Sequence, residues 1–107
     1  FYYMTATSGG ASRLYEWIEW WLQSGWDYDI HLLNATDTRA AINIAGPRSR
    51  DLLSKICDDV DLSNEAFPYM AARQGTIAGV PALLMRIGFT GELSYEVHVP
   101  SGYALHF

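Results

Sequence analysis

The sequence has a single cysteine and few basic residues, and both scarcities narrow the choice of function. Cys57 has no second cysteine with which to form a disulfide or begin a structural zinc site. Lysine and arginine number 7 against 12 aspartates and glutamates, a formal net charge of −5. Phosphate recognition depends on basic surface, so we expect no nucleic-acid partner and no membrane partner. The lone cysteine favours a reducing, cytoplasmic location.

Long apolar runs are also missing, and no stretch is long enough to span a bilayer. Half of the 107 residues are nevertheless hydrophobic and 14% are aromatic, including 4 tryptophans and 7 tyrosines. This content excludes a disordered chain and predicts one domain with a core built partly from rings. Phe1 lies inside a strand-like segment and Phe107 inside what reads as the start of a helix. We therefore expect residues 1–107 to be part of a domain from a longer protein.

One apolar stripe predicts a helix that ends at Gly25. Trp17 and Trp21 lie on the stripe and are expected to pack inward, whereas Trp20 lies off it and is the candidate for an interface. The apolar positions recur at intervals of three and four residues: Leu14, Trp17, Ile18, Trp21 and Leu22.

The remaining pattern predicts an α+β fold, an antiparallel-rich sheet with two main helices. We expect 28–33 to pair with 40–44, and 73–77 with 80–87 around the turn Ala78-Gly79. A second helix is predicted after Gly46-Pro47, and its buried stripe is Leu52, Leu53, Ile56 and Cys57. The strand-like segments are residues 1–7, 28–33, 40–44, 67–70, 73–77, 80–87 and 93–99.

Most polar constellations favour ordinary structural roles. His31, His98 and His106 do not show metal-ligand spacing, which favours surface or hydrogen-bonded histidines and predicts no metal site. Cys57 has no nucleophile signature and is expected to be a buried, inert thiol. Glu96 is different, because alternation places this mid-strand carboxylate opposite the apolar face and close to a glycine-rich loop. It is either a solvent-facing side chain or an acceptor for paired N–H donors of a ligand.

The stretch G-F-T-G-E-x-x-Y-E at 88–96, with Arg86 before it, resembles the signature of the aminomethyltransferase (glycine-cleavage T-protein) folate-binding family. The segment 45–53 is similar to that family's G-P-x-x-R-x-x-L. Details at 7–11, 16–17, 21–23 and 67–71 resemble most closely one branch of the family, the α subunits of heterotetrameric sarcosine oxidases. The resemblance covers essentially the whole chain but only part of the family's domain.

The resemblance implies a tetrahydrofolate site with Glu96, Phe89, Thr90 and Arg86 as folate-binding residues. One-carbon units from the oxidative demethylation of sarcosine would be captured there as 5,10-methylenetetrahydrofolate. The catalytic aspartate is expected upstream of Phe1, so residues 1–107 alone are expected to be inactive and to hold no catalytic residue.

Several further expectations follow from the same branch of the family. Flavin and NAD would bind other parts of the parent protein, and the partners would be the rest of the parent chain and other subunits. Two alternatives stay open. One is an aminomethyltransferase of the glycine-cleavage system, and the other is a non-catalytic folate-binding or structural module.

Overall fold

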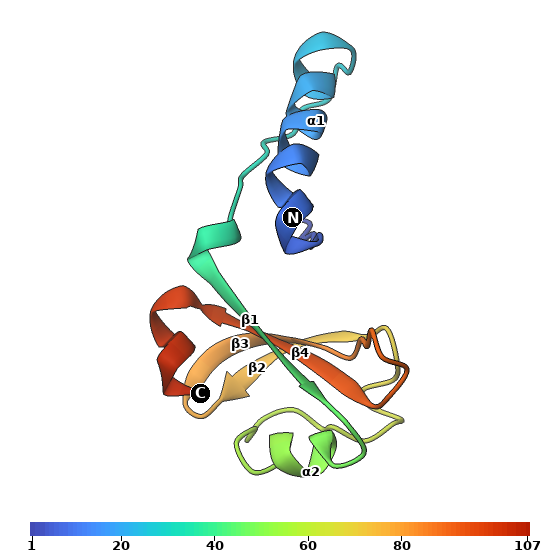
Figure 1. The fold of residues 1–107 in the computed structure, drawn as a ribbon, viewed down its shortest axis with the longest axis vertical. Helices are drawn as coiled ribbons and strands as arrows, with labels where there is room; N and C mark the ends of the chain where they lie inside the picture. The colour runs from blue at the N-terminus through green and yellow to red at the C-terminus, as the bar shows by residue number, and fades with distance from the viewer. The chain divides into compact units, whose positions relative to one another are not determined.

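The computed structural model describes residues 1–107 and divides them into two compact units, Phe1–Thr36 and Asp37–Phe107 (Figure 1). We call them the N-terminal unit and the C-terminal unit. The chain is an α+β protein with a four-stranded antiparallel sheet, as the sequence predicts. No helix combines the length and the apolar character that crossing a membrane requires.

The N-terminal unit contains a short 3-10 helix, η1 (Ser8–Gly10), and the longest helix, α1 (Ala11–Ser24). The predicted end at Gly25 is confirmed, because the Gly25 N–H donates to the Trp21 carbonyl at 3.0 Å and the helix stops there. The strand expected at residues 1–7 is wrong, since these residues form no regular element before η1. A strand needs a hydrogen-bonded neighbour, and aromatic composition alone does not supply one.

The tryptophans of α1 and Trp26, which follows the helix, contact one another. Trp21 stacks on Trp26 with 5.3 Å between ring centroids and 14° between planes, and it meets Trp20 edge-on at 4.8 Å. The inward position expected for Trp17 is wrong, since Trp17 is 55% exposed, nearly as much as Trp20 at 57%. No residue of α1 is buried, because the N-terminal unit provides no second layer to cover the stripe.

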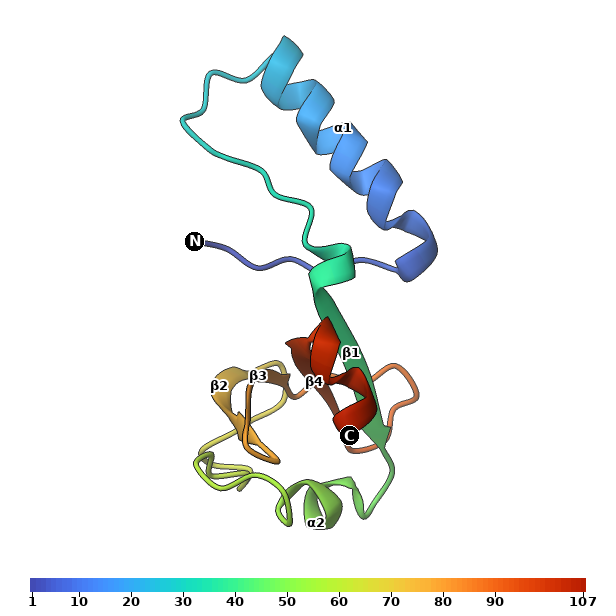
Figure 2. The same cartoon turned by 90° about the vertical axis from the view of Figure 1, so that its left-hand side faces the viewer.

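The sheet of the C-terminal unit has the strand order β1-β4-β3-β2, so β4 lies inside it and β1 and β2 form its edges (Figures 1 and 2). The pairing expected between 28–33 and 40–44 is wrong. Residues 28–33 form no strand, and β1 pairs instead with β4, with Ile42 opposite Val97. The elements are η2 (Thr36–Thr38), β1 (Arg39–Ala45), α2 (Ser49–Leu53), β2 (Ala72–Ile77), β3 (Val80–Met85), β4 (Ser94–Pro100) and η3 (Ser101–His106).

The second predicted hairpin is confirmed. β2 and β3 pair along their whole length, from Ala72 opposite Met85 to Ile77 opposite Val80. The two turn residues have positive φ angles, 47° at Ala78 and 79° at Gly79. Two successive positive φ angles are characteristic of the tight turn whose twist matches that of paired strands.

One face of the sheet carries the core, and α2 with the chain after it lies on that side (Figure 2). Tyr95, Val97 and Val99 of β4 are at most 1% exposed, and each such side chain contributes roughly 1.5–3 kcal/mol through burial. Of the stripe expected for the second helix, Leu53 is buried on α2, whereas Cys57 is buried but lies beyond the end of this helix. The other buried apolar side chains of this core are Leu62, Phe67, Ile77, Val80, Ala82 and Leu84.

Two details of the covering segment differ from expectation. Leu52 is 53% exposed, because α2 is only five residues long and turns Leu53, not its neighbour, towards the sheet. The extended segment expected at 67–70 is a turn, in which Met70 has a φ of 67°. Phe67 is fully buried at the start of this turn while Tyr69 is exposed, whereas residues two apart on an extended strand would share a face.

The acidic segment 58–61 before this turn is a loop, and two of its carboxylates accept hydrogen bonds from backbone N–H groups. The Thr76 N–H donates to Asp59 Oδ1 at 2.7 Å, and the Ser63 N–H donates to Asp61 Oδ1 at 2.8 Å. These hydrogen bonds favour the charged form and lower the pKa of both carboxyl groups below its ordinary value. The first of them ties the loop to the edge strand β2.

Candidate functional site

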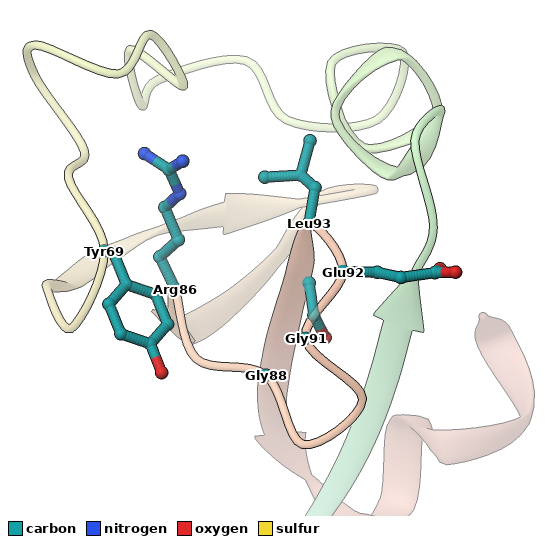
Figure 3. A pocket seen from close by; sticks show the side chains of 7 residues that line it. Tyr69, Arg86, Gly88, Gly91, Glu92 and Leu93 are labelled. Carbon is teal, nitrogen blue, oxygen red and sulfur yellow. The ribbon is translucent and has the colours of Figure 1, made fainter.

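A hollow of about 450 Å³ opens where β3 ends and β4 begins (Figure 3). Its wall combines the loop between these strands with the turn that precedes β2. In Figure 3 the Tyr69 ring and the Arg86 side chain stand on one side, and Glu92 and Leu93 stand on the other. The lining residues are Tyr69, Arg86, Gly88, Gly91, Glu92, Leu93 and Ser94.

Glycines shape the loop of this hollow. Gly91 has a φ of 81°, a conformation that other residues rarely adopt. At Gly88 a side chain would crowd its neighbours, since an added Cβ would lie 3.1 Å from the Ser94 Cβ and 3.2 Å from the Glu92 carbonyl oxygen. The loop therefore closes back tightly on the first residue of β4, which leaves room for the hollow beside it.

Arg86 holds the opposite wall together. Its Nη1 donates to the Phe67 carbonyl at 2.7 Å, and its backbone pairs with the same turn through the Ala71 carbonyl and the Met70 N–H, each at 2.9 Å. These three hydrogen bonds involve residues on either side of Tyr69 in the chain, and the Tyr69 side chain is 65% exposed at the rim of the hollow. Arg86 thus lines the hollow, as its predicted site role requires, while its guanidinium fixes the turn that carries Tyr69.

Glu96 lies on β4, two residues beyond Ser94 and on the same face of the sheet. Asn43 of β1 and Met85 of β3 are directly opposite it. Its side chain is 31% exposed, and Oε2 accepts a hydrogen bond from His98 Nε2 at 3.1 Å. The prediction that Glu96 lies opposite the apolar face is correct. Glu96 is the next residue on this face of β4 after Ser94, which lines the hollow.

The four predicted folate-binding residues are only partly brought together. Arg86 lines the hollow and Glu96 follows its wall along β4, whereas Phe89 and Thr90 occupy the tip of the loop and do not line it. Phe89 is fully exposed. Its ring therefore does not fill the hollow.

Sequence reasoning missed three neighbours of the site. Tyr69 lies in a turn that no periodicity indicates. Asn43 donates from Nδ2 to Ser94 Oγ at 3.1 Å, across 51 positions of sequence. Alternation along β4 could have identified Ser94, because it places Ser94 and Glu96 on one face, but the partner on β1 follows only from the strand register.

The two segments that carry the family resemblance meet in space. Leu93, in the loop of the hollow, accepts two hydrogen bonds on its carbonyl oxygen, from the Gly46 N–H at 2.9 Å and from Ser49 Oγ at 3.0 Å. Ser49 is buried at the start of α2. The turn after β1 therefore supports the wall of the hollow from behind, although 44 positions separate Ser49 from Leu93 in sequence.

No group of three or more histidine, cysteine, aspartate or glutamate side chains is arranged to hold a metal ion. Cys57 is a free, buried thiol beside the edge strand, where it forms an isolated bridge with Ile77. The burial expected for Cys57 is confirmed. The chemistry available at the hollow comes instead from carboxylate and hydroxyl oxygens, one guanidinium and the exposed ring of Tyr69.

The fold and this pair of linked segments define a known class of domain. The family described as the GCVT N-terminal domain matches residues 1–107, the whole chain. The chain therefore belongs to the GCVT N-terminal domain family, and the resemblance drawn from the glycine-rich segment is confirmed.

Curated relatives of three kinds match nearly all of the chain. It is 40% identical over 105 residues to the sarcosine oxidase subunit alpha of Rhizobium meliloti, which covers 95% of this chain and 10% of the relative. It is 36% identical over 106 residues to the mitochondrial sarcosine dehydrogenase of Mus musculus, 97% of this chain and 11% of the relative. It is 30% identical over 105 residues to an aminomethyltransferase of Caldanaerobacter subterraneus, 98% of this chain and 27% of the relative. The chain thus spans about a tenth of the length of the oxidase and dehydrogenase relatives.

Proposed function

We propose that this chain forms part of the tetrahydrofolate-binding domain of a sarcosine-oxidase-type enzyme. The observation that carries the proposal is the position of Glu96, a partly exposed carboxylate on the central strand, next to a hollow walled by the segments that define the family. The parent enzyme would oxidise the N-methyl group of sarcosine, and the domain would capture the one-carbon unit as 5,10-methylenetetrahydrofolate. Flavin and NAD would be bound by other parts of the parent or by its other subunits.

The described residues fit a pterin in size and in chemistry. A hollow of about 450 Å³ falls in the range of small-molecule sites, roughly 300–1,000 Å³. The pterin ring offers adjacent N–H donors from its ring N3 and 2-amino group, and a carboxylate can accept both in parallel. Glu96 supplies such a carboxylate on the same face as Ser94, while Arg86, Thr90 and Phe89 provide the remaining proposed contacts around the loop.

The oxidase branch is favoured over the alternatives by similarity. Identity is 40% to a sarcosine oxidase subunit alpha and 30% to an aminomethyltransferase over almost the same residues. The aminomethyltransferase of the glycine-cleavage system is the second candidate, because it would use the same folate site with a lipoyl-bound donor. The cytoplasmic location stays a prediction, and the matched relatives include a mitochondrial dehydrogenase.

The test is a calorimetric titration of the intact protein with tetrahydrofolate, compared with its Glu96→Ala variant. Loss of a hydrogen-bonded charge should weaken binding by roughly 2–3 kcal/mol, or about 30- to 150-fold. Glu65→Ala, which removes an exposed carboxylate outside the hollow, is the matched control and should bind normally. Unchanged affinity in a folded Glu96→Ala protein would refute the assignment of Glu96.

A second measurement separates the branches of the family. With sarcosine as donor, the intact protein should yield methylenetetrahydrofolate, and Glu96→Ala should release formaldehyde while sarcosine oxidation continues. An intact protein that binds folate, leaves sarcosine untouched and accepts only a lipoyl-bound aminomethyl donor would support the glycine-cleavage candidate. Absence of any folate binding would support a structural module.

A further inference from the structure

The face of β4 that carries Glu96 also carries a buried histidine. The His98 side chain is only 5% exposed, although Ala41 opposite it on β1 is exposed and Leu83 opposite it on β3 is partly exposed. A buried imidazole needs hydrogen-bond partners. One of them is Glu96, whose Oε2 lies 3.1 Å from His98 Nε2.

This contact follows from strand geometry. Residues two apart on a strand point to the same face, so His98 and Glu96 are neighbours along β4. The bond requires the proton on Nε2, which then donates to the carboxylate. Asn43, the residue opposite Glu96, gives its amide N–H to Ser94 instead, and Met85 on the other side has no donor in its side chain.

We propose that His98 is a positioning residue for the carboxylate of Glu96, which binds the ligand. By donating to Oε2 it restricts the rotation of the Glu96 side chain and keeps the carboxylate in one orientation before the ligand arrives. The carboxylate still has acceptor capacity for two further N–H donors, because its two oxygens together offer about four lone-pair sites. An acceptor that is already oriented binds more tightly, since less side-chain freedom is lost on binding.

The surroundings suit this role. Ala41 and Leu83, directly opposite His98, and Asn43 and Met85, directly opposite Glu96, do not titrate. Arg39 is the nearest basic residue on the same face of β1, opposite Pro100 and beyond His98. The residues directly opposite the pair on both neighbouring strands are therefore neutral, and His98 contacts the Glu96 carboxylate. The inference rests on the proposed function, in which Glu96 binds folate.

The experiment measures tetrahydrofolate affinity of the intact protein by calorimetry for His98→Leu and His98→Gln. The leucine variant lacks the donor and should bind roughly 5- to 10-fold more weakly, the ratio expected for one hydrogen bond. The glutamine variant can place an amide N–H near the position of Nε2 and should recover most of the affinity. His31→Leu, at an exposed position of the N-terminal unit, is the control and should match the unchanged protein.

A double-mutant cycle separates positioning from a general structural role. In a Glu96→Ala background, His98→Leu should cause no further loss of affinity, because there is no carboxylate left to orient. An equal loss in both backgrounds would overturn the proposal. If His98→Leu does not fold, His98→Gln decides alone: near-normal affinity supports positioning, and a tenfold loss in a folded protein overturns it.

Failure of this inference can be told from failure of the proposed function. If Glu96→Ala weakens folate binding and folded His98→Leu does not, Glu96 binds the ligand without help from His98. If Glu96→Ala leaves affinity unchanged, the folate role of Glu96 and the positioning role of His98 are both refuted.

Discussion

Arg50 of α2 donates from Nε to the hydroxyl oxygen of Tyr95 on β4, at 3.0 Å. Tyr95 is completely buried, and the Nη2 of the same arginine donates to Asn64 Oδ1 at 2.6 Å. One guanidinium therefore connects the short helix, the central strand and the loop that covers the core. Arg50 is the arginine of the G-P-x-x-R-like segment, so this arginine stabilises the packing of α2 against the sheet.

Tyr95→Phe should lower the stability of the C-terminal unit. The substitution keeps the ring and its contact with Phe67 but leaves Arg50 Nε without its acceptor, at an expected cost of about 1–2 kcal/mol. Urea unfolding followed by circular dichroism measures the change. Tyr103→Phe, at a half-exposed tyrosine of η3, is the control; if both variants change stability equally, the Arg50 bond is not the cause.

Arg86→Met should loosen the turn that carries Tyr69. It removes the hydrogen bond from Nη1 to the Phe67 carbonyl while keeping an apolar side chain of similar length. The expected loss of stability is about 1–2 kcal/mol. This is in the lower range for a charged hydrogen bond, because Arg86 is only partly buried. Hydrogen exchange of residues 67–71 should become faster, whereas exposed Arg39→Met should leave it unchanged. A loss of folate affinity with normal exchange would instead make Arg86 a direct ligand contact.

Ala78→Asn should stabilise the β2–β3 hairpin. Alanine is unfavourable at the φ of 47° observed there, and Asn-Gly is the preferred pair for a two-residue turn with two positive φ angles. The expected gain is about 0.5–1 kcal/mol. The same urea titration measures it, and a decrease in stability would show that the bond from the Ala78 N–H to the Ile56 carbonyl had been disturbed.

Asp59 should make the stability of the C-terminal unit depend on pH in the acid range. The Thr76 N–H lowers the pKa of this carboxyl group in the folded state. The stabilisation is therefore present above the pKa of the unfolded chain and is lost as pH falls through the lower, folded value. Asp59→Asn should flatten the curve of unfolding free energy between about pH 5 and pH 2. Identical slopes for both proteins would contradict this.

Local elements were predictable from the sequence, and their partners were not. Each predictable element depends on a pattern within a short stretch of sequence: the stripe of α1, the turn at Ala78-Gly79 and the alternation of β4. The pairing of β1 with β4 places Ile42 opposite Val97. Alternation in the sequence predicts that both residues belong to strands but does not predict that these strands pair. Residues 28–33 alternate as well, but they form no strand, because alternation does not specify a hydrogen-bonded neighbour.

The candidate site shows the same division. Arg86 was predicted because it precedes a recognisable motif, and Glu96 because it belongs to that motif and is off-pattern in a strand. Tyr69 reaches the rim through the positive φ of Met70, which nothing in the local sequence indicates. The contact of His98 with Glu96 could have been inferred from their spacing, once the strand was accepted.

The uneven placement of the rings has a practical consequence for spectroscopy. All four tryptophans lie between Trp17 and Trp26, within the N-terminal unit, and the C-terminal unit has only tyrosines as ultraviolet fluorophores, one of them the buried Tyr95. Within residues 1–107, emission excited at the red edge of indole absorption therefore comes from α1 and from Trp26, which follows it. No tryptophan lies among the residues of the sheet, so Phe67→Trp, beside Tyr95 in the core, would place an indole in the unit that contains the candidate site.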